Sequence, residues 1–148
     1  MAEFLANNIQ TIAPGEDAVF EQNIGCNRGN ILFRPQTGQI LLKGNTSNRF
    51  ARYQVTFNGN IAIPTSGTIG PIAVGLTILG SVIPTSTAIV TPTVVDAYFN
   101  ITSTAIIDIP AGCCMAVSVR NVSEGLTTAV TNPSINLQNA NLVIIRVA

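Results

Sequence analysis

Three cysteines are the residues of this chain whose chemistry is most open to question. Cys113 and Cys114 are adjacent and follow a Pro-Ala-Gly turn at 110–112, while Cys26 lies far away in a second turn. Neighbouring Cα atoms are about 3.8 Å apart, below the roughly 4.4 Å minimum of ordinary disulfides, so the adjacent pair is not expected to bridge. Cys26 could pair with either one, which would leave one thiol over.

Neither catalysis nor metal binding is expected of these thiols. A nucleophilic cysteine needs a nearby base or a lowered pKa, and the chain contains no His. A structural zinc ion takes about four ligands, which three cysteines without His do not supply within one chain. Because side chains alternate between the two faces of a strand, we expect Cys113 to join Met115 on an inward apolar face. Cys114 would then lie on the outer face.

The carboxylates form no clearer site. Glu16 and Asp17 follow a Pro-Gly pair, which is typical of a solvated turn. Asp96 and Asp108 are predicted on the outer face of one long strand or of two. The stretch 67–75 contains several glycines but lacks the Lys and the following helix of a phosphate-binding loop. The sequence thus predicts a protein that is not an enzyme, with no catalytic residue, metal ion or cofactor.

Low charge excludes several classes of partner. Seven Lys and Arg balance seven Asp and Glu, and charged residues make up 9% of the chain, against roughly 25% in an average globular protein. Such a chain has no electrostatic footprint for nucleic acid or an anionic membrane. The charge-free run 53–95 is broken by prolines, and its longest apolar piece without Pro has 12 residues, whereas a spanning helix needs about 20. We expect neither nucleic acid nor a membrane as a partner.

Alternating hydrophobicity predicts a chain built of strands. Residues 51–57 alternate with a period of two, as do the positions from 95 to 109, and 72–79 are uncharged on both faces. A last strand is expected over 141–148, and turn sequences rich in Pro, Gly, Asn and Ser separate these segments. Over 148 residues this pattern predicts one all-β domain, an antiparallel sandwich or barrel.

Several of these segments resemble the C1q/TNF-like jelly roll. Residues 107–121, IDIPAGCCMAVSVRN, are similar to its turn and penultimate core strand, and 50–63, 72–87 and 136–148 are similar to further strands and hairpins of that fold. Within the family the similarity is to the C-terminal domains of BclA-type spore-surface proteins and their relatives in phages of Firmicutes and gut bacteria. The resemblance covers 49–148, and it implies a jelly-roll sandwich that assembles as a homotrimer. Residues 1–48 would add further strands, which could also dock on a partner.

The uncharged outer faces favour the same self-association. Exposed apolar strand faces are a liability on a monomer, so the outer faces at 73–79 and 142–144 are expected to lie between copies. Each candidate could instead belong to the core of a single chain. The candidate interface residues are Tyr53, Phe57, Tyr98, Leu142 and Ile144.

These expectations favour a structural role on a larger particle. The preferred hypothesis is a trimeric capsid decoration or head-fibre protein on the surface of a phage virion, in contact with the capsid shell. The alternative is a glycan-binding module, lectin-like or adhesin-like, of a phage fibre or of a bacterial spore or cell surface. Sugar sites usually offer exposed aromatic side chains, and the chain has two Tyr and no Trp, which weighs against the alternative.

Overall fold

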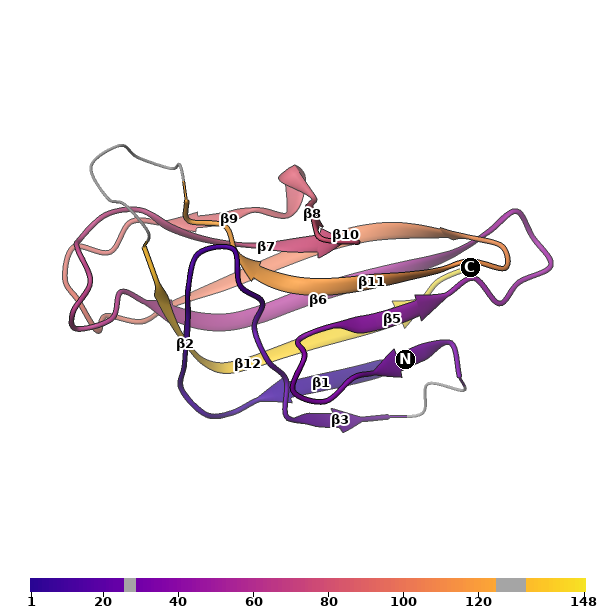
Figure 1. Ribbon diagram of the computed structural model, residues 1–148, viewed down its shortest axis with the longest axis horizontal. Helices are drawn as coiled ribbons and strands as arrows, with labels where there is room; N and C mark the ends of the chain where they lie inside the picture. Colours follow the sequence, from indigo (N-terminus) through magenta and orange to yellow (C-terminus); the bar gives the residue numbers. More distant parts are fainter. Residues whose placement is uncertain (26–28, 125–132) are drawn as a thin grey trace.

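Two antiparallel sheets stack face to face in the computed structural model, which describes residues 1–25, 29–124 and 133–148 (Figure 1). Sheet A has the strand order β10-β6-β12-β1-β3, with β2 beside β12, and sheet B has the order β4-β5-β11-β7-β8, with β9 beside β7. The strands of sheet A are β1 (Ala2–Ala6), β2 (Gln10–Ile12), β3 (Gln22–Ile24), β6 (Phe50–Ala62), β10 (Phe99–Pro110) and β12 (Ile135–Arg146). Those of sheet B are β4 (Ile31–Phe33), β5 (Ile40–Lys43), β7 (Ile72–Ile78), β8 (Ser81–Val82), β9 (Ala88–Val90) and β11 (Cys114–Asn121).

The predicted all-β architecture is confirmed within the described residues. Their helical content is one 3₁₀ turn, η1 (Pro84–Ser86), and none of their helices is long and apolar enough to cross a membrane. The first 48 residues contribute strands to both sheets, because β1 pairs with β12 and β5 pairs with β11.

Strand β6 confirms the predicted alternation. Ala51, Tyr53, Val55 and Phe57 are fully buried, while the residues between them are half-buried on the outer side. Alternation in β10 begins later than predicted, because the core residues start at Ile101 and the segment 95–98 is not a strand. Asp96 has φ of +56°, in the left-handed region that strands exclude. The expectation that Asp96 and Asp108 share a strand face is therefore wrong.

Strand β12 carries the largest correction. Its pairing with β6 shifts register between Gln138 and Asn141, and Asn139 has φ of +49°, as in a β-bulge. The extra residue reverses which positions face inward, so Leu142 and Ile144 are fully buried while Ile145 is exposed. The predicted outer face at 142–144 is thus an inner face, and the outward residues are Val143 and Ile145.

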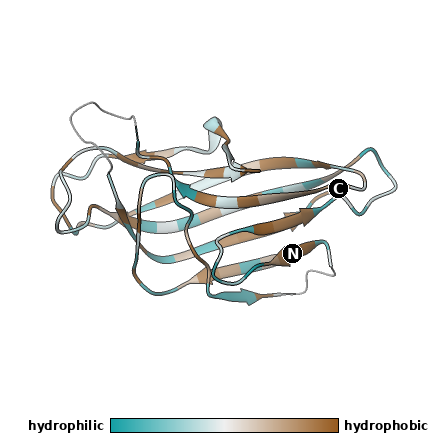
Figure 2. Ribbon diagram, in the orientation of Figure 1, coloured by the Kyte–Doolittle hydropathy of each residue, from teal (hydrophilic) through white to brown (hydrophobic). Residues whose placement is uncertain are grey.

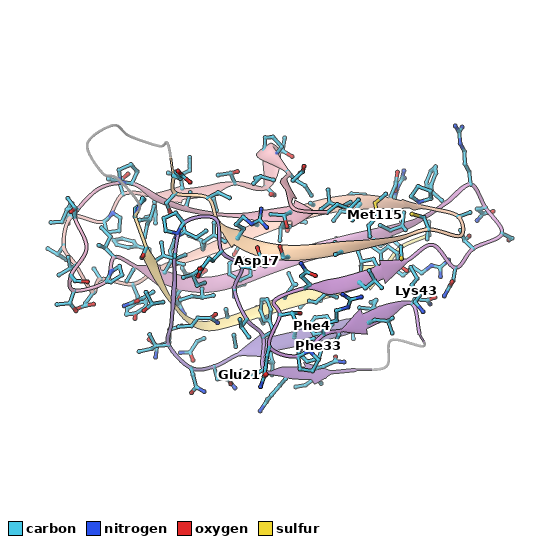
Figure 3. All side chains as sticks on the ribbon, in the orientation of Figure 1. Phe4, Asp17, Glu21, Phe33, Lys43 and Met115 are labelled. Atoms are coloured by element: carbon cyan, nitrogen blue, oxygen red, sulfur yellow. The ribbon has the colours of Figure 1, made fainter. Side chains whose placement is uncertain are left out.

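The core fills the space between the two sheets. Hydropathy changes from residue to residue along the long strands (Figure 2), since one side of each faces this core. The rings of Phe4 and Phe33, which come from opposite sheets, lie 5.2 Å apart between centroids (Figure 3). Tyr53 is buried, and its hydroxyl donates to the Lys43 carbonyl oxygen at 2.6 Å. Burial raises the pKa of Tyr53, and the charge of Arg146 opposes this shift.

The chain itself covers the outer side of β7. Six of the seven residues of this strand are buried. The expectation that the outer face at 73–79 lies between copies is therefore wrong for Ala73, Gly75 and Thr77, while Leu79, beyond the strand, is 65% exposed. A Cβ atom on Gly75 would lie 3.4–3.5 Å from side-chain atoms of Val82, Thr87 and Val122. The Leu76 N–H donates to the Ser86 hydroxyl and the Ala73 N–H to the Ser123 hydroxyl, both at 2.9 Å. These hydroxyls satisfy strand N–H groups that would otherwise be buried without a partner.

Candidate functional site

The structure describes two of the three cysteines. Cys113 and Cys114 are exposed free thiols, and Cys26 lies outside the described residues. The expectation that Cys113 points into the core is wrong, because β11 begins one residue later, after the β10–β11 turn (Figure 1). That turn lies at the end of the molecule (Figure 1), beyond the part of β11 that is buried in the core, where Val117 lies.

Several carboxylates are engaged in local pairs. Asp108 accepts hydrogen bonds from Arg52 Nε at 2.7 Å and Nη2 at 2.9 Å, and these bonds lower the pKa of its carboxyl. Asp17 accepts from Arg120 Nε at 2.9 Å, and Asp96 accepts from the Thr65 hydroxyl at 2.6 Å. Within the described ranges, no group of three or more His, Cys, Asp or Glu residues is placed to hold a metal ion.

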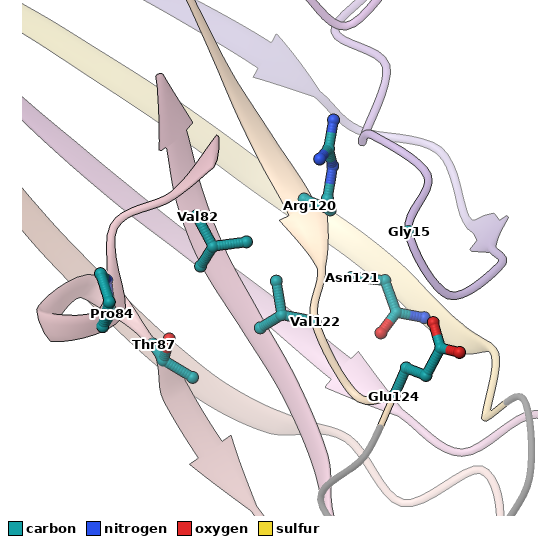
Figure 4. Close-up of a pocket in the computed structure, with 8 residues that line it drawn as sticks. All are labelled: Gly15, Val82, Pro84, Thr87, Arg120, Asn121, Val122 and Glu124. Carbon is teal, nitrogen blue, oxygen red and sulfur yellow. The ribbon is translucent and has the colours of Figure 1, made fainter. Parts of the chain in front are cut away.

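A pocket of about 430 Å³ opens beside the end of β11 (Figure 4). Two charged residues line it. Arg120 is already used, because Nε binds Asp17 and Nη1 donates to the Gly80 carbonyl oxygen at 2.7 Å, and Glu124 is exposed to solvent. The Asn121 side chain donates to the carbonyl oxygens of Ile12 and Pro133. What remains is a mostly apolar hollow with few free polar groups, lined by Gly15, Val82, Pro84, Thr87, Arg120, Asn121, Val122 and Glu124.

The outward side of sheet A, which we call the open face, has apolar residues in one half and amide side chains in the other. It consists of the outward residues of β1, β6, β10 and β12. One row across it joins Ile145 to Gln54 and Gln54 to Ile106. Ile106 is 57% exposed and Ile145 is 38% exposed. The next row joins Val143, Thr56 and Thr104, and Glu3 of β1 pairs with Val143 at its end. We call these two rows on β6, β10 and β12 the apolar half; there the face is uncharged and rich in branched side chains.

Amide side chains occupy the other half of the open face. Asn58, Asn60 and Asn100 cluster on β6 and β10. Asn100 Nδ2 donates to Asn58 Oδ1 at 2.9 Å and to Asn60 Oδ1 at 3.2 Å. We call this set, together with the outward Asn and Gln of β12, the amide half; its members are Asn58, Asn60, Asn100, Asn136, Gln138 and Asn141.

Charge is confined to the margins of the open face. The Arg52–Asp108 pair lies on β6 and β10 at the end of the apolar half, and the Arg52 guanidinium lies 5.1 Å from the centre of the Phe50 ring. Glu3 on β1 accepts from Asn141 Nδ2 at 3.0 Å. A surface this poor in net charge does not attract polyanions or repel a second copy of itself.

The predicted interface residues are mostly not on this surface. Tyr53, Phe57, Leu142 and Ile144 are fully buried within one chain, so their side chains cannot meet a neighbouring subunit. Tyr98 is 37% exposed and precedes β10. Ile106 and Ile145 were not among the predicted candidates, although Ile106 stands out as an apolar residue among the polar even positions of 100–108.

No family model matches the chain, and no curated protein sequence matches it. Among solved structures, the globular domain of zebrafish complement 1qA protein is similar over 99% of this chain and 96% of its own, with 10% identity and a TM-score of 0.58. Eiger TNF from S. frugiperda is similar over 100% and 92%, with 12% identity and a TM-score of 0.57. A sugar-binding protein, the EclA C-terminal domain, is similar over 95% and 79%, with 15% identity and a TM-score of 0.44. The chain has the C1q/TNF-like jelly-roll fold, as the sequence resemblance implied.

Proposed function

We propose that this chain is a non-enzymatic structural module that assembles as a homotrimer through its open face. One observation carries the proposal: the open face exposes Ile106 and Ile145 in an uncharged row, whereas the same chain covers the outer side of β7 with its own side chains. Burying apolar area stabilises an assembly by about 25 cal/mol per Å² before association costs. The apolar half of another copy is an uncharged partner of the same chemistry.

The setting we favour is the outside of a larger particle, a phage virion on which the trimer is a capsid decoration or head fibre. In that setting the module acts mechanically, and the N-terminal strands β2 and β3, which lie outside the open face, contact the shell. The low charge of the chain supports this role, because 9% charged residues leave few side chains to keep an isolated monomer soluble.

The experiment that tests the trimer is a matched pair of surface variants. Ile106 and Ile89 are 57% and 58% exposed, and they lie on β10 of sheet A and on β9 of sheet B. We expect light scattering of the unaltered chain to give three times 15.5 kDa. Ile106→Asn should shift this mass toward the monomer, while Ile89→Asn should leave it unchanged. A monomeric unaltered chain at micromolar concentration would overturn the proposal.

A glycan-binding role is the second candidate, and one observation favours it. Tyr98 and Phe99 are 37% and 40% exposed and precede Asn100, whose amide is at the surface. Sugars stack their C–H faces on aromatic rings and bind amides through their hydroxyls. A glycan array probed with the unaltered chain and with Tyr98→Ala decides this point, since a sugar site requires a signal that the variant loses.

A further inference from the structure

The amide half of the open face contains hydrogen-bonding capacity that the single chain does not use. Asn58 Oδ1 accepts from Asn100 Nδ2 at 2.9 Å and from the Thr102 hydroxyl at 3.4 Å. The Asn58 Nδ2 group donates to none of the residues that the structure describes. Asn60 Nδ2 reaches only the Gln138 carbonyl oxygen, at 3.4 Å. Several donors of this cluster are therefore free to bind water or a partner.

Only a partner with matching hydrogen-bonding groups can cover this cluster without a cost in free energy. A donor that is buried without an acceptor costs roughly 1–3 kcal/mol, so an apolar partner is rejected. A charged partner would lose its hydration without finding an opposite charge. An amide both donates and accepts, so a second copy of the same cluster is a chemically matched partner, provided that it arrives in a position where donors face acceptors.

The amide cluster lies directly beside the apolar half, so its choice of partner affects how copies of the chain associate. The row that joins Asn58 to Asn141 and Thr102 is adjacent to the row of Val143, Thr56 and Thr104 on the same sheet face. Copies that bury the apolar half with their strands running in the same direction therefore also bring their amide halves close together. Apolar side chains tolerate many relative positions, whereas hydrogen bonds between amides do not. Single buried polar residues fix register and oligomeric state in this way in other assemblies.

We infer that the amide half fixes the register and the copy number of the assembly, while the apolar half supplies its affinity. This inference rests on the proposed self-association and names the residues that would decide its geometry. The occupant of the amide half is a second copy of this chain, whose amides pair with those of the first.

The decisive variant is Asn58→Leu combined with Asn100→Leu, examined by native mass spectrometry. If the amides fix the geometry, the variant remains associated, because its apolar half is still buried between copies. It becomes a mixture of oligomers, because pairing between amides no longer selects one arrangement. A uniform oligomer identical to that of the unaltered chain would overturn the inference. Circular dichroism and thermal unfolding establish that the variant is folded.

A second variant, Asn58→Asp, tests whether the amide cluster is buried between copies. The substitution changes the shape of the side chain very little. Like charges brought together in an interface weaken association, so we expect the dissociation constant to rise at least about tenfold at pH 8 and to recover at pH 4. Asn48→Asp is the control, because Asn48 is exposed in the β5–β6 loop. Equal behaviour of the two variants would overturn the inference.

The outcomes separate this inference from the proposed function. A monomeric unaltered chain removes both, whereas a trimer that is indifferent to Asn58 and Asn100 removes only the role of the amides. If Asn58→Asp leaves the oligomer intact but abolishes binding to a neutral saccharide on an array, the amide half binds sugar rather than a second copy, and the inference is wrong.

Discussion

Strands β7 and β10 differ in how their outer sides are covered. The outer side of β7 is small and uncharged, whereas Ile106 is the one large apolar residue among the polar outward positions of β10. Ala73 and Thr77 of β7 are almost completely buried, while Ile106 is 57% exposed. Over β7 the segment that contains β8, η1 and β9 returns as cover, together with Val122. Ile106 lies at the end of its row on the edge strand β10; Gln54 and then Ile145 follow it across the sheet, and both are at least partly exposed.

The difference shows where the cover of an apolar strand comes from. Where the chain supplies it, polar groups are satisfied within the molecule, as the Ser86 and Ser123 hydroxyls illustrate. Where the chain does not supply it, the exposed row is a surface for another molecule.

The largest effect is expected for inward residues of β12. Leu142 is fully buried, and Leu→Ala substitutions in cores cost about 2–5 kcal/mol. Leu142→Ala should lower the free energy of unfolding of each subunit by this amount in urea titrations at any protein concentration. Ile145→Ala, three residues away on the outward side, should mainly weaken association. Equal losses in the two variants would contradict the assigned phase of β12.

The cover of β7 should be sensitive to a single hydroxyl. The Leu76 N–H donates to Ser86 Oγ at 2.9 Å in a buried setting, so Ser86→Ala leaves that N–H without its partner. We expect a loss of about 1–3 kcal/mol in the free energy of unfolding. Ser66→Ala is the control, since Ser66 is exposed in the β6–β7 loop and should change stability by less than about 0.5 kcal/mol. A neutral Ser86→Ala would mean that β7 needs no such cover.

The ion pair at the margin of the open face should give a small dependence of stability on pH. The bonds from Arg52 lower the pKa of Asp108 in the folded state below its ordinary value of 3.8. The pair therefore contributes stability above pH 3.8 and loses it as the pH falls through the lowered value. Asp108→Asn should flatten this part of the pH profile of thermal unfolding. If the acidic part of this pH profile were the same in the variant, the pair would contribute nothing to stability.

The smallest effect is expected for the thiols. Cys113 and Cys114 are exposed and free, so the variant with Ser at both positions should change the free energy of unfolding by less than about 0.5 kcal/mol. In the folded protein both thiols should react with a maleimide at the rate of a free cysteine. Protection of either thiol under non-reducing conditions would point to a bridge with Cys26.

Part of this architecture could be predicted from local pattern. In β6 the contrast between apolar and polar positions is strong, so both the strand and its inward face were predicted correctly. In β12 the stretch from Leu142 to Ile145 is apolar on both faces, and the bulge at Asn139 reverses the phase. No local signal determines which half of such a strand points inward. The interface residues Leu142 and Ile144 were misplaced for this reason.

The class of the fold and the low charge follow from the amino-acid sequence alone, because alternation and composition are properties of neighbouring residues and of the whole chain. His-based chemistry is excluded in the same way, since the chain has no His. Which apolar residues remain uncovered, and which amides meet on one sheet face, depends on how the strands pair in the folded chain. Those outcomes depend on the register between β6, β10 and β12, whose paired residues are as far as 93 positions apart, as Tyr53 and Arg146 are. Local periodicity contains no information about such distant pairings.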